Sequence, residues 1–171
     1  MGADWGIISA RMYDWKVLFV KPRTEKQVLE YCSLYGIPVY LPLREKTHVV
    51  QRRKVTVKVP VFPGYVFASF GHGQRLQLLQ TNLLVRVLEP ENPRRMLRDL
   101  IMVRRALRAN PSLEAAKPLT CGRLVRVISG PFMGVEGRVA RLAGKVKVVL
   151  NIDMIGQAVS VTASMDQIEV L

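Results

Sequence analysis

A stretch without periodicity, ANPSLEAAKP at residues 109–118, divides the chain into two parts with different sequence patterns. Before it, apolar residues recur at both strand and helix spacing, whereas after it short apolar runs alternate with glycine-containing turns. Small, polar and proline residues are typical of linkers between domains. We therefore expect an N-terminal tail at 1–13, a first domain at 14–108, a linker at 109–119 and a second domain at 120–171.

The first part has the order of an α+β domain, with an antiparallel sheet and helices on one side of it. WKVLFV at 15–20 is an apolar run of strand length and predicts a buried central strand. In the next segment, Thr24 with Gln27 three residues later predicts a capping box, and Gly36 predicts the end of the helix. A second long helix is expected after Asn92, with Pro93 as its first residue.

Between these helices, two valine-rich runs surround the polar residues QRRK at 51–54 and predict a β-hairpin with a basic tip. Val55, Val57 and Val59 alternate with polar residues, so one face of the second strand is expected to be apolar. Pro60 cannot donate to a strand ladder, which indicates an edge strand or a bulge. GYVFASF, at 64–70, predicts another central strand.

The second part contains only strand and turn patterns, five short strands in all, which favour a small β-barrel. Its density of valine, isoleucine and threonine disfavours a helical alternative. We therefore expect this domain to remain a barrel.

Charge and residue usage restrict the function. The chain of 171 residues has 26 Lys and Arg against 13 Asp and Glu, a net charge of +13, and most of the excess lies before residue 111. Such a field attracts nucleic-acid phosphates or acidic protein surfaces. No catalytic pair, phosphate loop, metal-ligand spacing or bilayer-spanning apolar run is recognisable. We expect a cytoplasmic monomer that is not an enzyme and has no metal, cofactor or membrane partner.

Four motifs follow one another along the chain, and their order is informative. Trp15 opens the first strand, QRRK forms the hairpin tip, FPGYVF spans 62–67, and GRLVRVISGPFMGVEGRV at 122–139 resembles a KOW motif. In this order the chain resembles the NusG family of transcription elongation factors, over nearly its whole length. The resemblance implies an NGN domain followed by an SH3-like KOW domain.

Within that family, an aromatic-lined surface of the NGN domain binds the clamp helices of the largest subunit of RNA polymerase, which favours processive elongation. The resemblance assigns this docking role to five residues: Trp15, Phe62, Pro63, Gly64 and Tyr65. Exposed aromatic side chains are effective interface anchors. The alternative is that Phe62 and Tyr65 pack into the domain's own core, as we expect for Phe67.

The resemblance also places a basic surface near the DNA of the elongation complex, including the displaced non-template strand. Six residues are candidates for this contact: Lys21, Arg23, Gln27, Arg52, Arg53 and Lys54. Cations neutralise phosphates there. For the hairpin tip, the alternative is an ordinary solvated turn.

In the second domain, the resemblance implies a partner site at Met154, Ile155 and Gln157, where the family contacts the termination factor Rho or a small-subunit ribosomal protein. The family's common FGR is IGQ in this chain, so an aromatic anchor and a cation are missing. An apolar interface or simple closure of the barrel are the two remaining interpretations.

Overall, the sequence is closer in character to specialised paralogues such as RfaH than to the general factor, which favours an operon-specific antiterminator. The competing hypothesis is a KOW-type protein that binds ribosomal RNA.

Overall fold

The computed structural model describes residues 15–113, 115–119, 121–142 and 145–171. The expected tail at 1–13 lies outside these residues. The described chain forms two compact units, one made of residues 15–42 and 62–97 and the other of residues 43–61 and 98–171. Neither unit is continuous in sequence, whereas the sequence predicted a single division at 109–119.

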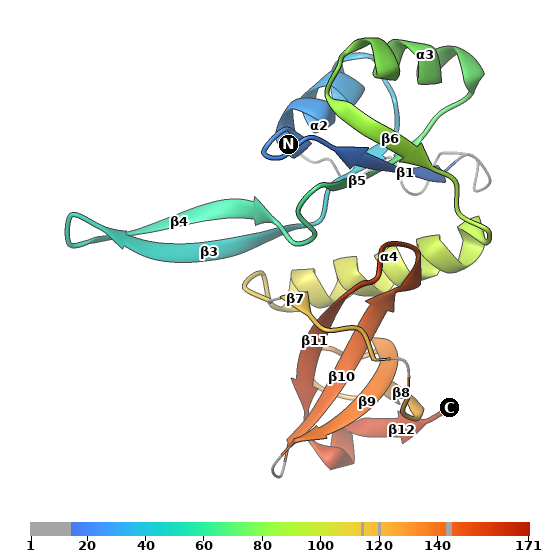
Figure 1. Cartoon of the computed structure of the whole chain (residues 1–171). Helices are drawn as coiled ribbons and strands as arrows, with labels where there is room; N and C mark the ends of the chain where they lie inside the picture. The colour runs from blue at the N-terminus through green and yellow to red at the C-terminus, as the bar shows by residue number, and fades with distance from the viewer. Residues whose placement is uncertain (1–14, 114, 120, 143–144) are drawn as a thin grey trace. The chain divides into compact units, whose positions relative to one another are not determined.

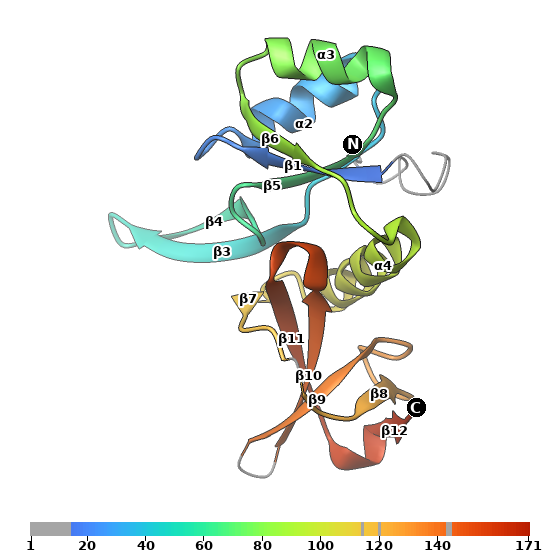
Figure 2. The ribbon, with the colours of Figure 1, turned by 45° about the vertical axis from the view of Figure 1, so that its right-hand side comes forward.

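The first unit is built on a four-stranded antiparallel sheet. Its strands, in hydrogen-bonded order, are β2 (Val39–Tyr40), β5 (Tyr65–Ser69), β1 (Trp15–Val20) and β6 (Leu84–Leu88). Helices α2 (Glu25–Leu34) and α3 (His72–Gln80) cover the same face of this sheet in both views (Figures 1 and 2). The α+β arrangement predicted from the sequence is confirmed.

The two central strands, β1 and β5, are nearly continuous runs of buried apolar residues. Trp15, Val17, Leu18 and Val20 are all at most 1% exposed, so side chains on both faces of β1 are covered. A strand buried on both faces needs an apolar run rather than alternation. The expectation of a central strand at 15–20 is therefore confirmed.

The predicted capping box at the start of α2 is wrong. Thr24 makes no side-chain bond to the helix backbone, because its hydroxyl donates instead to the carbonyl of Lys21 at 2.8 Å. At the other end, Gly36 follows the helix with a φ of +64°, as expected.

After β5, helix α3 begins at His72. Gly71 precedes the helix and its amide donates to Gln74 Oε1 at 3.3 Å. Only Leu78 of α3 is buried, while Leu76 and Leu79 are exposed.

The second unit includes the predicted hairpin, β3 (Leu43–Val50) and β4 (Arg53–Pro60), seen in Figure 1 as a two-stranded ribbon. Its turn contains two residues, Gln51 and Arg52, rather than the four expected. Valines become more covered with distance from the tip, since Val55 of β4 is 38% exposed and Val61, directly after β4, is 1% exposed. Pro60 pairs with Leu43 at the base of the ribbon.

The long helix α4 (Pro93–Ala109) begins where the sequence predicts. The Asn92 side chain caps it by accepting from the Arg95 amide at 3.0 Å. Leu100, Val103 and Ala106 are buried, whereas Ile101 is 40% exposed.

The rest of the second unit is one six-stranded antiparallel sheet. Its strands, in order, are β12 (Ile168–Val170), β8 (Leu124–Val127), β9 (Glu136–Leu142), β10 (Lys145–Ile152), β11 (Gln157–Ala163) and β7 (Ala115–Ala116). All-β character is confirmed for this C-terminal β domain. Gly137 allows β9 to approach β10 closely, because a Cβ there would lie 2.5 Å from the Val149 carbonyl oxygen.

Strand β7 lies inside the stretch expected to be an irregular linker. Ala115 and Ala116 pair with Val159 and Ala158 of β11. A two-residue strand leaves no periodic signal, so only the pairing itself could identify it.

Candidate functional site

The Pro-Gly corner is held by three backbone contacts within the first unit. Gly64 has a φ of +85°, a conformation that favours glycine. Its carbonyl accepts from the Val20 amide at 2.9 Å, and its amide donates to Oε1 of the buried Glu25 at 2.8 Å. The Tyr65 amide donates to the Phe62 carbonyl at 3.2 Å. The corner is therefore fixed to both β1 and α2.

Beside this corner, two aromatic rings and a cation lie in a row across three strands. Phe19 of β1 is paired with Tyr65 of β5 on one side and with Arg86 of β6 on the other. The Phe19 and Tyr65 ring centroids are 5.3 Å apart, and the Arg86 guanidinium carbon lies 5.9 Å from the Phe19 ring centroid. We call Tyr65, Phe19 and Arg86 the aromatic row.

The aromatic row is accessible, since both rings are partly exposed and Arg86 is exposed. Sequence reasoning found Tyr65 but missed Phe19 and Arg86. The spacing within WKVLFV gave no indication of Phe19, because pairing register decides which residues meet across a sheet.

Two of the predicted docking residues are buried. Trp15 is 0% exposed and Phe62 is 1% exposed, so the expectation of an exposed Phe62 ring is wrong. Burying a ring of this size removes much apolar area from water, which favours the core position. Pro63 is exposed and Tyr65 is partly exposed. The core interpretation of Phe67, which is 0% exposed, is confirmed.

The hairpin tip has an unfavourable backbone for its residues. Gln51 and Arg52 have φ values of +46° and +64°, the pattern of a type I′ turn, which strongly favours Asn-Gly. A side-chain-bearing residue in this region costs about 1–2 kcal/mol. The chain therefore places an exposed arginine at a position where glycine would be more stable.

Cations continue along both faces of the ribbon. Arg53 shares one face with Arg44 and Lys46, and the other face carries Lys54 and Lys58, as the pairing register shows. Residues 43–60 contain six Lys and Arg against one Glu. The sequence hypothesis included the tip but missed Arg44, Lys46 and Lys58, although their spacing of two within strands could have revealed them.

The other predicted nucleic-acid residues lie on the first unit, after β1. Arg23 is exposed and also has a positive φ, of +65°. Lys21 donates to Asn82 Oδ1 at 3.0 Å, and Gln27 is exposed in the first turn of α2. These residues and the hairpin tip belong to different units, and the cations of each group are exposed.

The predicted partner segment of the C-terminal β domain forms a short 3₁₀ helix, Asp153–Ile155. Ile155 is only 9% exposed, while Met154 and Gln157 are partly exposed. The burial of Ile155 favours the interpretation that this residue closes the domain's own core.

The two cysteines differ in environment. Burial raises the pKa of Cys32 from 9.0 to about 12, whereas Cys121 is exposed. Within the described residues, no cluster of His, Cys, Asp or Glu has the three members needed to hold a metal ion. No helix in the described ranges is long and apolar enough to cross a bilayer.

Comparison with known proteins adds independent information. The family model for NusG, described as transcription termination factor nusG, matches residues 13–104. No curated protein matches the sequence significantly.

Among solved structures, Thermotoga maritima NusG, from a study of its domain interaction, has a TM-score of 0.50 and 20% identity, covering 91% of this chain and 96% of that one. This likeness supports the fold. A chain of the MjSpt4:Spt5 complex in conformation B has a TM-score of 0.32 and 14% identity, covering 92% of this chain and 96% of that one, which is too low to support an inference. Because the family model matches more than half of the sequence, the chain belongs to the NusG family of transcription factors.

Proposed function

We propose that this protein is an elongation factor that binds RNA polymerase through the aromatic row and the neighbouring Pro-Gly corner. The observation that carries the proposal is the partial exposure of Tyr65 and Phe19 on the two central strands of the sheet, with ring centroids 5.3 Å apart. Rings held in place lose little entropy on binding and are enriched at the centres of interfaces. Membership of the NusG family supports the choice of polymerase as the partner.

The surface bound is the pair of clamp helices on the largest subunit, and binding there favours processive elongation. Arg86 adds a cation beside the Phe19 ring, which suits a helical partner with acidic side chains. Trp15 and Phe62 belong to the core rather than to the surface that contacts the partner, because both are buried.

The basic hairpin and the residues after β1 contact the DNA of the elongation complex, including the non-template strand. Backbone strain at Arg23 and Arg52 supports this proposal. Sparsely populated conformations are costly and cluster at functional positions. An arginine in place of glycine at the tip sacrifices stability and adds a phosphate-binding charge.

The C-terminal β domain serves as a KOW module that recruits a partner. Substitution of FGR by Ile155-Gly156-Gln157 argues for weaker contacts with Rho or a small-subunit ribosomal protein than in the general factor. We infer an operon-specific antiterminator of the RfaH type, acting in the cytoplasm as a monomer.

The test is binding to an assembled elongation complex, with read-through of a terminator as the functional measurement. Tyr65→Ala should abolish binding and read-through. Tyr35→Ala is the matched control, because Tyr35 is an exposed tyrosine, at 56%, directly after α2 in the same unit. If Tyr65→Ala and Tyr35→Ala both bind like the unmodified protein, polymerase docking at the aromatic row is refuted.

A ribosomal-RNA-binding protein is the competing function, and it requires RNA affinity in the C-terminal part. From residue 111 onward there are only 7 Lys and Arg against 5 Asp and Glu. That balance gives weak attraction to phosphates. RNA binding that survives Tyr65→Ala, without polymerase binding, would favour this function.

A further inference from the structure

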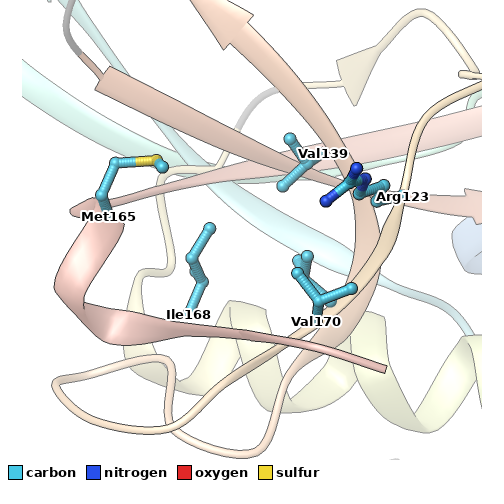
Figure 3. Close-up of a pocket in the computed structure, with 6 residues that line it drawn as sticks. Arg123, Val139, Met165, Ile168 and Val170 are labelled. Atoms are coloured by element: carbon cyan, nitrogen blue, oxygen red, sulfur yellow. The ribbon is translucent and has the colours of Figure 1, made fainter.

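The C-terminal β domain contains a surface cavity that none of the functions above uses. Its volume is about 440 Å³, and it is lined by Arg123, Val125, Val139, Met165, Ile168 and Val170. Figure 3 shows Val139 and Arg123 across the cavity from Met165 and Ile168. Met165 and Val170 are 56% and 57% exposed, so apolar side chains also rim the mouth. A volume in this range is typical of binding sites.

The one charged group in the lining is Arg123, and its guanidinium makes no hydrogen bond or ion pair in the described part of the chain. Among the charged side chains on the neighbouring strands, two form an ion pair with each other and a third lies on the opposite face of the sheet. Arg126 is bonded to Glu136 at 2.8 Å, and Glu169, which pairs with Arg126, lies on the opposite face of the strands from Val170. A complementary ligand is therefore apolar with an anionic group at one end.

The wall of the cavity is also an open sheet edge. Strand β12 is at one end of the hydrogen-bonded order. The Leu171 amide donates to Leu124 at 3.0 Å, and the Gln167 carbonyl accepts from Ile128 at 2.8 Å, so odd-numbered residues of this strand face β8. In an antiparallel ladder the intervening residues point their backbone groups the other way. Val170 therefore presents its amide and carbonyl to the open edge.

Ile168 contributes less to that edge, since its amide donates to the Met165 carbonyl. Its carbonyl remains directed outward. The side chains of Ile168 and Val170 meanwhile line the cavity. The same two residues thus offer backbone pairing and an apolar face, which is the combination that strand addition uses.

We propose that an extended peptide from a protein partner adds to β12 as a further strand. Its residue opposite Val170 is apolar and fills the cavity, because paired residues project to the same face. The peptide runs antiparallel to β12. A glutamate two positions before the apolar residue lies on the same face and bonds to Arg123, because Arg123 is two residues before Val125, the partner of Val170. Two strand spacings separate such a peptide from β8, about 10 Å, which the long side chains of arginine and glutamate span together. The recognised pattern is glutamate, any residue, then a large aliphatic residue.

This site is separate from the partner segment at Met154 to Gln157, and it does not depend on polymerase docking. The lining residues come from β8 and the residue directly before it, from β9 and β12, and from the 3₁₀ helix Met165–Gln167. The predicted partner segment instead lies between β10 and β11.

The test uses the intact protein and a fluorescein-labelled eight-residue peptide that carries glutamate two positions before leucine. Three comparison peptides have lysine in place of glutamate, alanine in place of leucine, or an N-methylated leucine amide that cannot donate to the Val170 carbonyl. Each change should weaken binding by about tenfold or more. Amide shifts in NMR spectra should be largest at Val170 and Ile168.

Two protein variants identify the cation. Arg123→Glu should reverse the preference, so that the lysine peptide binds more tightly than the glutamate peptide. Lys147→Glu makes the same charge change at an exposed position of β10 and should leave the preference within about twofold, because isolated surface charges contribute little. Arg123→Gln should remove the preference without reversing it.

Three results would overturn the proposal: no saturable binding of any peptide, an unchanged preference in Arg123→Glu, or amide shifts centred away from β12. Because Arg123 is exposed, circular dichroism of the variants should match that of the unmodified protein.

Discussion

Glu25 offers the sharpest test of how the Pro-Gly corner is held. Within the part of the chain that the structure describes, Glu25 is one of two buried polar or charged residues, at 6% exposed. Its Oε1 accepts from the Gly64 amide at 2.8 Å, and it also stands in the first turn of α2, where a negative charge is favourable. Replacing it by alanine leaves the Gly64 amide without this acceptor.

The expected loss in the free energy of unfolding follows from these two contributions of Glu25. A hydrogen bond to a charged group contributes about 1.5–3 kcal/mol, and a carboxylate near a helix N-terminus about 0.3–1 kcal/mol. We expect Glu25→Ala to lower the free energy of unfolding by about 2–3 kcal/mol. Glu25→Gln retains an acceptor oxygen and should cost about 1 kcal/mol.

The assay is urea unfolding followed by the fluorescence of Trp15, in a Trp5→Phe background so that the signal reports the first unit. Glu30→Ala is the control, because Glu30 is exposed on the same helix, and its effect should stay within about 0.5 kcal/mol. The reasoning is refuted if Glu25→Ala falls within the range of the control, or if the glutamine variant is as unstable as the alanine variant.

Three further outcomes follow from the structure. Gly64→Ala should destabilise the first unit by about 1–2 kcal/mol in the same urea assay, because φ is +85° and the new Cβ would lie 3.3 Å from Phe19 Cε2; an unchanged midpoint would contradict this. Converting Gln51-Arg52 to Asn-Gly should raise hydrogen-exchange protection in the hairpin while lowering the salt slope of single-stranded DNA binding by about 0.7; an unchanged slope would remove Arg52 from the contact. Cys32, with its pKa raised from 9.0 to about 12, contributes stability below pH 9 that is lost as pH rises towards 12, because only the unfolded thiol ionises in that window. It should therefore resist alkylation in the native protein at pH 8.5 while the exposed second cysteine reacts, and equal rates would contradict the buried thiol.

The sequence was most informative where one local rule decided the structure. The apolar run at 15–20 predicted a strand covered on both faces, and its burial confirms this. The Asn92-Pro93 pair predicted the start of a helix, and the hydrogen bond from the Arg95 amide to the Asn92 side chain confirms it. Thr24 shows the limit of such rules. Its hydroxyl had two acceptable partners, and the Lys21 carbonyl rather than the helix amide is the one it contacts.

The candidate site was less predictable because it depends on long-range pairing. Tyr65 was recognisable from its motif, but its neighbours Phe19 and Arg86 are determined by the register of β1 with β5 and β6. The Phe62 ring was expected to be exposed because of its position in the motif, but it is buried in the structure. Similarly, the positive φ of Arg52 could not be read from a turn whose length was predicted as four residues instead of two.

The central claim is that Tyr65 contacts RNA polymerase, and site-specific photocrosslinking tests it most directly. A photoreactive phenylalanine derivative would replace Tyr65 in one protein and the exposed Tyr35 in another, and each would be irradiated in an assembled elongation complex. Docking through the aromatic row predicts a crosslink from position 65 to the clamp helices of the largest subunit and none from position 35. Absence of a crosslink at 65, or equal crosslinks from both positions, would contradict the account.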